Sequence, residues 1–155
     1  MKNNKFKRKK IKLAASVDCS NADANITSEN ININACKRQI ENYNLLIKMI
    51  KRIQKNPLSD EEKNSKIANL NQFIEIENKI HESYLEEWNN NKNNTVALEK
   101  YSKAANNILV YTYELQILES NDLNENLNDF KNKRKDSIAG IKESNKRIKS
   151  YKKCP

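Results

Sequence analysis

Apolar residues recur every three or four positions along most of this chain, which is the period of an amphipathic α-helix. The pattern predicts four long helices, at about 28–56, 60–90, 95–119 and 122–151. The third has the most regular alternation of three- and four-residue steps, a seam of the coiled-coil kind formed by Ala97, Tyr101, Ala104, Ile108, Tyr111, Leu115 and Leu118.

The breaks between these stretches carry helix-ending and helix-starting residues. Pro57 ends the first stretch, because the residue before a proline is pushed out of the helical region. A capping box, Ser59-Asp60-Glu61-Glu62, opens the second, and Thr95 is a candidate cap for the third after the Asn-rich stretch 89–94. A similar box, Asp122-Leu123-Asn124-Glu125, opens the fourth.

The 155 residues include only one glycine and two prolines, the residue types that most often form tight turns and end strands. Long helices of matched length joined by short connections pack as antiparallel neighbours. The fold class expected is therefore all-α, an antiparallel bundle of four long amphipathic helices with a basic N-terminal arm. Residues 1–27 are expected to form that arm, or a degenerate signal, plus a loop, and residues 28–155 the helical bundle domain.

The net charge of +9 is concentrated at the two ends of the chain. Residues 13–128 hold 12 bases and 17 acids, so the basic ends enclose a mildly acidic body. The basic arm contains Lys5, Lys7, Arg8, Lys9 and Lys10. Six lysines of the last helix fall within a narrow arc, roughly 100° from its apolar stripe, and define a basic ridge: Lys131, Lys135, Lys142, Lys146, Lys149 and Lys153. Such ends fit nucleic acid, an anionic surface or an acidic partner, or are simply solvated.

The sequence contains no clear pattern of catalytic or metal-binding residues. The only histidine, His81, lies beside an apolar stripe and has no second histidine with which to build a diiron site. One glycine cannot form a phosphate-binding loop, and no Cys-x-x-Cys pair is present for zinc. We expect no catalytic residue, no metal and no cofactor, and therefore a protein that is not an enzyme.

Two questions stay open at the N-terminus. The basic residues before Ala14-Ala15-Ser16-Val17 read either as a degenerate secretion signal or as a basic arm. In an oxidising compartment a Cys19–Cys36 disulfide would fasten the leader to the first helix, leaving Cys154 for a dimer bridge or as a free thiol. In a reducing cytosol all three cysteines are thiols.

Three elements follow one another near the N-terminus: Asp18-Cys19-Ser20-Asn21-Ala22, Asn34-Ala35-Cys36, and a helix with Tyr43 and Leu46. With them, residues 14–50 resemble the start of mature lysozyme-inhibitor-like proteins, a family of small secreted helical bacterial proteins. The resemblance implies a helical fold, a bridge between Cys19 and Cys36, and a signal removed near Val17.

Two functional hypotheses follow. The first is a non-enzymatic binding protein of the bacterial cell envelope, periplasmic or secreted, with a basic hydrolase as its protein partner. The alternative is a cytoplasmic accessory or structural protein, of phage or ribonucleoprotein type, whose basic ends contact nucleic acid or an acidic partner. No apolar run reaches the length of a membrane span, and the sequence leaves the oligomeric state open.

Overall fold

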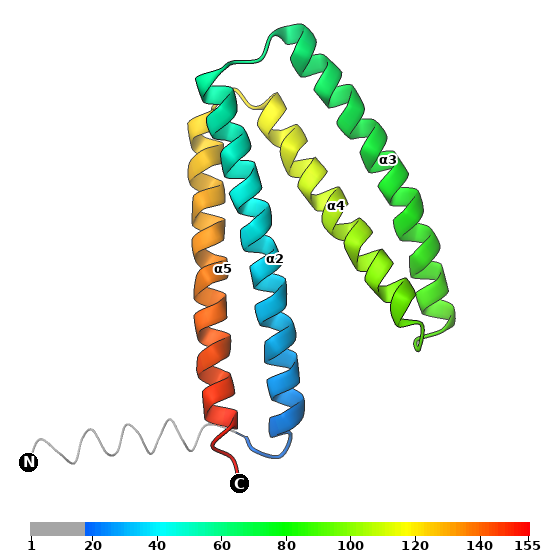
Figure 1. The fold of residues 1–155 in the computed structure, drawn as a ribbon, viewed down its shortest axis with the longest axis vertical. Coiled ribbons are helices and arrows are strands. Elements are labelled where there is room, and N and C mark those ends of the chain that lie inside the picture. Colours follow the sequence, from blue (N-terminus) through cyan, green and yellow to red (C-terminus); the bar gives the residue numbers. More distant parts are fainter. Residues whose placement is uncertain (1–17) are drawn as a thin grey trace, which may run out of the picture. The chain divides into compact units, whose positions relative to one another are not determined.

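The computed structural model describes residues 18–155, and this part of the chain contains four α-helices and no strand (Figure 1). The helices are α2 (Ala22–Lys55), α3 (Asp60–Asn90), α4 (Thr95–Glu119) and α5 (Leu123–Tyr151). Successive helices are joined by connections of only a few residues. The all-α class and the packing of long helices as antiparallel neighbours are confirmed.

Side chains at the helix starts explain most of these boundaries. The Ser59 hydroxyl accepts a hydrogen bond from the backbone N–H of Glu62 at 3.2 Å, as a capping box requires. The cap of α4 is Asn94, whose side-chain oxygen accepts from the N–H of Ala97 at 3.1 Å, and Thr95 is the first helical residue instead. At the start of α5, Asp122 accepts from the N–H of Glu125 at 3.0 Å.

The first helix begins earlier than its apolar pattern predicts. α2 starts at Ala22, so residues 22–27 are helical and the expectation of a loop up to residue 27 is wrong for them. Residues 22–27 alternate apolar and polar side chains, so they lack the three- and four-residue apolar period by which the helix was recognised. Between residue 18 and this helix there remains only a short turn.

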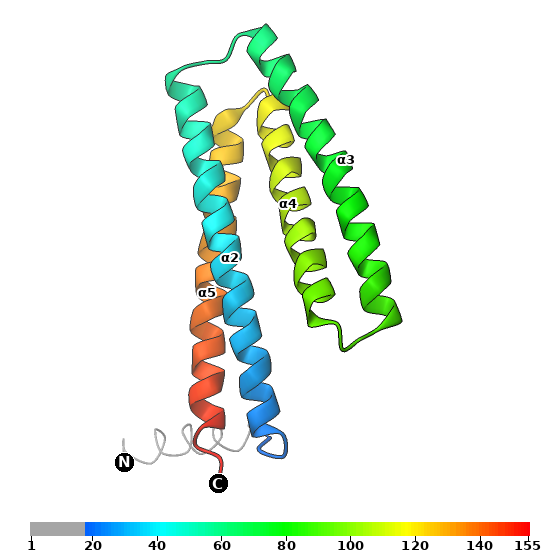
Figure 2. The ribbon, with the colours of Figure 1, turned by 45° about the vertical axis from the view of Figure 1, so that its right-hand side comes forward.

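The chain divides into two compact units. Of the described residues, the terminal unit comprises 18–43 together with Lys131–Pro155, and the central unit is Asn44–Phe130. In the terminal unit, the first part of α2 and most of α5 run antiparallel, side by side in both views (Figures 1 and 2). Their buried residues include Ile33, Tyr43 and Ile148, with Ser137 and Ser144 at two of the α5 positions.

In the central unit, α3 and α4 form an antiparallel hairpin (Figure 2), and the unit also includes the last turns of α2 and the first turns of α5. The α4 seam predicted from the sequence is partly buried throughout, and its two alanines, Ala97 and Ala104, are 1% and 2% exposed. The buried apolar residues of the unit are Leu46, Ile47, Ile50, Leu70, Ala97, Ala104, Ile117, Leu118 and Phe130.

Not every apolar residue of these amphipathic helices is buried, since Phe73, Ile80 and Ile138 are exposed. In α5 the buried line runs through Phe130, Ser137 and Ser144, seven residues apart, so two of its positions carry small polar side chains. The nearest apolar residue to Ser137, Ile138, lies one position further on and is exposed.

Candidate functional site

The basic ridge lies on the outer side of α5, in the terminal unit. Lys131, Lys135, Lys142, Lys146 and Lys149 are all in the helix, and Lys153 follows directly after its end. All six lysines are exposed. At 100° per residue, the five helical lysines fall within about 60° of arc, on the side turned away from Ser137 and Ser144. The helix therefore brings them together as a row of positive charge.

Few acidic groups neutralise this row among the described residues. Lys146 forms an ion pair with Glu143 at 3.6 Å, and both side chains are well exposed, at 75% and 58%. Exposed pairs of this kind are screened by solvent and exchange readily with other partners. The row thus keeps its positive potential.

Arg147 has a different role from the ridge lysines, because it joins α5 to α2. Its Nε donates to Glu29 Oε1 at 2.6 Å, and its Nη2 donates to Oε2 at 3.2 Å, a bidentate pair between the two helices. The hydrogen bond from Arg147 holds the pKa of Glu29 below its ordinary value. Composition counts Arg147 with the other bases, and only the three-dimensional pairing separates it from them.

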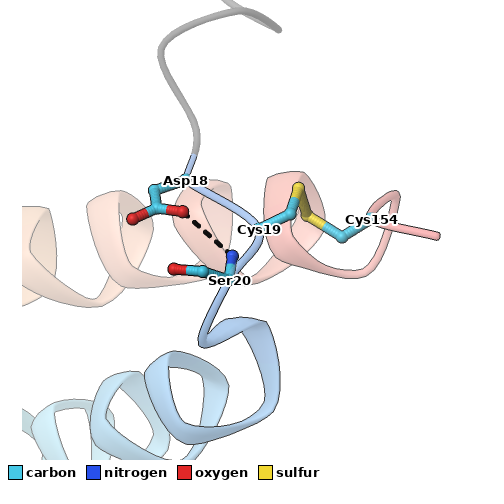
Figure 3. The surroundings of a disulfide bond; sticks show 4 residues. All are labelled: Asp18, Cys19, Ser20 and Cys154. Atoms are coloured by element: carbon cyan, nitrogen blue, oxygen red, sulfur yellow. Dashed lines mark hydrogen bonds between the residues drawn. A yellow bond between two sulfur atoms is a disulfide. The ribbon is translucent and has the colours of Figure 1, made fainter.

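A disulfide joins the segment before α2 to the segment after α5 (Figure 3). It links Cys19 to Cys154, with a Cα–Cα distance of 5.6 Å. Beside it the Asp18 carboxylate accepts a hydrogen bond from the backbone N–H of Ser20 at 2.9 Å, and this bond lowers the pKa of Asp18. The bridge therefore fastens the two ends of the terminal unit.

The expected Cys19–Cys36 disulfide is wrong. Because α2 begins at Ala22, about 14 residues of helix, roughly 21 Å, separate its first turn from Cys36. A disulfide requires Cα atoms about 4.4–6.8 Å apart. Cys36 is a free, half-buried cysteine on the side of α2 that faces α5, where its Sγ lies 3.1 Å from the position that a Cβ on Gly140 would occupy.

The central unit contains one acidic group that no sequence pattern singles out. Glu114 is half-buried beside a hollow of about 290 Å³ lined by Met49, Leu70 and Phe73. Burial raises the pKa of the Glu114 carboxyl, and the nearby charge of Lys66 acts in the opposite direction. Lys66 lines the same hollow and is the one other ionisable residue among the described residues of its lining.

The remaining candidates from the sequence are His81, a metal site and the basic arm. The imidazole of His81 packs against Tyr101, with ring centroids 4.6 Å apart. Within residues 18–155, no three His, Cys, Asp or Glu side chains are grouped so that they could hold a metal ion. The basic arm, Lys5, Lys7, Arg8, Lys9 and Lys10, lies outside the described residues.

Fold and site together define an all-α protein with a disulfide that joins the two ends of its helical region and a lysine row on its last helix. No helix in the described part of the chain is long and apolar enough to cross a membrane. No protein-family model, no curated protein and no solved structure matches this chain.

Proposed function

We propose that this chain is a non-enzymatic binding protein of the bacterial cell envelope, exported and then held by the Cys19–Cys154 disulfide. That bridge is the observation that carries the proposal. Disulfides persist in oxidising compartments such as the periplasm and are rare in the cytosol. Cys19 also follows closely on Ala14–Val17, the small residues at which a signal would be cleaved.

The partner that fits the central unit is a basic protein. This unit holds ten Lys/Arg against fourteen Asp/Glu, a net charge of −4. Five of its acids lie in the second half of α3, Glu75, Glu77, Glu82, Glu86 and Glu87. Opposite charge on two surfaces speeds their encounter and fixes their orientation. A lysozyme, which is basic, has the chemistry required, and the resemblance of residues 14–50 to lysozyme-inhibitor-like proteins points to the same partner class.

Intact mass of the protein from its native source, measured with and without alkylation under denaturing conditions, tests export. We expect loss of about 17 N-terminal residues, a single alkylated thiol at Cys36, and a non-reduced digest in which the peptides of Cys19 and Cys154 remain linked. A full-length chain with three reactive thiols would contradict the proposal.

An activity assay tests the partner separately. The purified protein should inhibit a lysozyme in a saturable manner at micromolar concentration, and Glu82→Lys/Glu86→Lys should weaken the inhibition at least tenfold. Glu41→Lys/Asp136→Lys, which reverses two exposed acids of the terminal unit, is the matched control and should have little effect. No effect on lysozyme at these concentrations would remove the inhibitor function and leave the envelope location to the mass measurement.

The exposed lysine row favours a second candidate, an intracellular protein that contacts nucleic acid or an acidic partner through its basic ends. Five lysines on one side of α5 span about 27 Å, which suits the backbone of a nucleic acid. Tyr151, partly buried at the end of the helix, is the only aromatic residue within or after the ridge, so binding would be electrostatic rather than base-reading.

Salt dependence separates this candidate from the first. Duplex DNA binding should weaken steeply with salt, and Lys142→Ala/Lys146→Ala/Lys149→Ala should flatten the slope of log K against log salt by about 0.9 for each phosphate that is no longer neutralised. Lys48→Ala/Lys51→Ala/Lys55→Ala removes the same charge from exposed lysines of α2 and should change the slope less. Absent or salt-independent binding would contradict this candidate.

A further inference from the structure

The three cysteines are paired in an order that an unfolded chain does not favour, because the bridge between Cys19 and Cys154 passes over Cys36. Cys36 is only about 17 residues from Cys19 along the chain. Cys154 is 135 residues from Cys19 and about 118 from Cys36. The probability that a flexible loop closes falls as roughly the 3/2 power of its length, so the Cys19–Cys36 loop closes about 20 times as often as either longer loop. An oxidant that meets the unfolded chain therefore joins Cys19 to Cys36 first.

This short-loop bridge cannot persist in the folded protein, because α2 begins at Ala22. About 14 residues of helix, roughly 21 Å, separate its first turn from Cys36. A disulfide needs Cα atoms within about 7 Å of each other, so this part of α2 stays non-helical for as long as Cys19 is bonded to Cys36. The same part of α2 carries Glu29, which pairs with Arg147 of α5. Folding of the terminal unit therefore favours a different partner for Cys19.

The folded terminal unit accounts for both sulfurs that such a change of partner involves. The antiparallel packing of α2 and α5 brings Cys154 to Cys19, with a Cα–Cα distance of 5.6 Å. Cys36 is left as a half-buried thiol against α5, with its Sγ 3.1 Å from the position of a Cβ on Gly140. The rate of thiol–disulfide exchange depends on access to the attacking thiol. Burial against α5 thus protects the new bridge from a return attack by Cys36.

We propose that the Cys19–Cys154 bridge is made by intramolecular thiol–disulfide exchange, in which Cys154 displaces Cys36 from a first bridge to Cys19. In the first step, a small disulfide such as oxidised glutathione accepts two electrons from the thiols of Cys19 and Cys36, and each thiol loses its proton. In the second step, the Cys154 thiolate attacks the Cys19 sulfur, the Cys19–Cys36 bond breaks, and Cys36 leaves as a thiolate that takes a proton from water.

The second step consumes no oxidant, because one disulfide bond forms as another breaks. The class of reaction that must follow the first oxidation of this chain is therefore disulfide isomerisation. The pathway requires an oxidant but no particular binding partner. It is accordingly tested on the isolated chain, separately from the function proposed above.

Oxidative refolding of the reduced, full-length chain tests the order of the two bridges. The chain is diluted from urea into a glutathione redox buffer, samples are quenched with acid, and free thiols are blocked with N-ethylmaleimide. Proteolysis after Glu29 then places Cys19 and Cys36 on different peptides, so mass spectrometry distinguishes all three pairings.

Early samples should contain roughly ten times or more Cys19–Cys36 than Cys19–Cys154, following the loop lengths. Late samples should contain almost only the Cys19–Cys154 form, with Cys36 as the blocked thiol. A Cys19–Cys154 bridge that appears without an earlier Cys19–Cys36 species overturns the proposal, and so does a final product that keeps Cys19–Cys36.

The acid-trapped Cys19–Cys36 species allows the second step to be followed alone. Returned to neutral pH without oxidant or reductant, it should convert to the Cys19–Cys154 form at a rate independent of protein concentration, since the exchange lies within one chain. Cys154→Ser is the matched control, because it forms the same first bridge and has no sulfur to displace Cys36. This variant should keep the bridge, and the mass readout does not require it to fold. A trapped species that converts only after glutathione is added, or a Cys154→Ser chain that loses the bridge equally fast, overturns the intramolecular step.

Discussion

Gly140 of α5 faces Cys36 of α2 at a separation that suits a residue without a Cβ. A methyl group there would lie 3.1 Å from the sulfur, closer than ordinary van der Waals contact. Glycine inside a helix is nevertheless about 1 kcal/mol less favourable than alanine. The better helix propensity of alanine and the close contact with the Cys36 sulfur act in opposite directions. The effect of Gly140→Ala on stability therefore depends on whether the sulfur is present.

Gly140→Ala is therefore expected to change stability little in the wild type and to raise the free energy of unfolding by about 1 kcal/mol in a Cys36→Ala background. Urea unfolding of the four proteins in this double-mutant cycle measures the difference. Equal gains in both backgrounds would show that the sulfur moves aside without cost.

The Glu29–Arg147 pair makes the stability of the terminal unit depend on pH. The pKa of Glu29 is lowered in the folded protein, so the unfolded chain binds the proton more readily. The contribution of the pair is complete above the ordinary glutamate pKa of about 4.5 and disappears as pH falls through the lowered folded value.

Glu29→Gln should thus reduce the free energy of unfolding at pH 7 by up to about 1 kcal/mol, as expected for a partly exposed ion pair, and have almost no effect near pH 2. Glu41→Gln, at an exposed glutamate of the same helix, provides the comparison. A deficit of Glu29→Gln that persists unchanged in acid would mean that the carboxylate charge is not what matters.

At the scale of whole helices, the start of α3 depends on a single serine. Ser59→Ala removes the acceptor for the Glu62 N–H and should cost about 1 kcal/mol. Thermal unfolding measures this loss. Ser65→Ala, at an exposed position inside the same helix, should be neutral or slightly stabilising because alanine is the better helix former. A Ser59→Ala variant as stable as its Ser65→Ala counterpart would show that the cap contributes nothing.

The ends of a helix could be predicted where a residue at that end favours or prevents helical backbone by itself. Pro57, Ser59 and Asp122 act on their immediate neighbours, and the boundaries near them agree with the structure to within a residue or so. At the start of α2, Asn21 is a residue type that often caps helices, but the alternating apolar and polar residues 22–27 that follow it hide the helical period. The buried side of α5 is hard to recognise from apolar residues alone, because Ser137 and Ser144 occupy two of its positions.

The pairing of the cysteines could not be predicted from the residues around each one. Cys19 and Cys154 are 135 residues apart, and they meet only because α2 and α5 lie antiparallel with their outer ends together. In the chain-entropy description, closing a loop of this length stabilises the folded protein by about 5 kcal/mol. Cys19→Ser/Cys154→Ser should lower the free energy of unfolding by up to that amount, measured in urea. Cys36→Ser keeps the bridge and should change stability far less, and an equal loss in both would contradict this account.

At the scale of the whole molecule, the two units differ in the interactions that stabilise them. The described part of the terminal unit has few buried apolar residues, a bidentate ion pair and the disulfide, and it carries twelve Lys/Arg against six Asp/Glu. The central unit has most of the buried apolar residues and a net negative charge. Covalent closure therefore matters more for the first unit than for the second.

Reduction of the disulfide should accordingly loosen one unit selectively. Hydrogen exchange after addition of a thiol reductant should rise in residues 22–43 and 131–151, while the α3–α4 hairpin keeps its protection. Reductant added to Cys19→Ser/Cys154→Ser provides the control, since that variant has no bridge to break. Uniform acceleration along the chain would show that the two units unfold together.

The bridge between Cys19 and Cys154 also makes residues 19–154 a covalent ring. A single cut of the backbone inside this ring, for instance in the connection at residues 91–94, opens the circle without releasing a fragment, so the two pieces separate only after reduction. The chain could therefore be given new ends at another point of this ring. A circularly permuted chain that joins residues 19 and 154 by a peptide linker and begins in the 91–94 connection would keep all four helices whole, and its new ends would lie beside the α3–α4 turn instead of at the bridge.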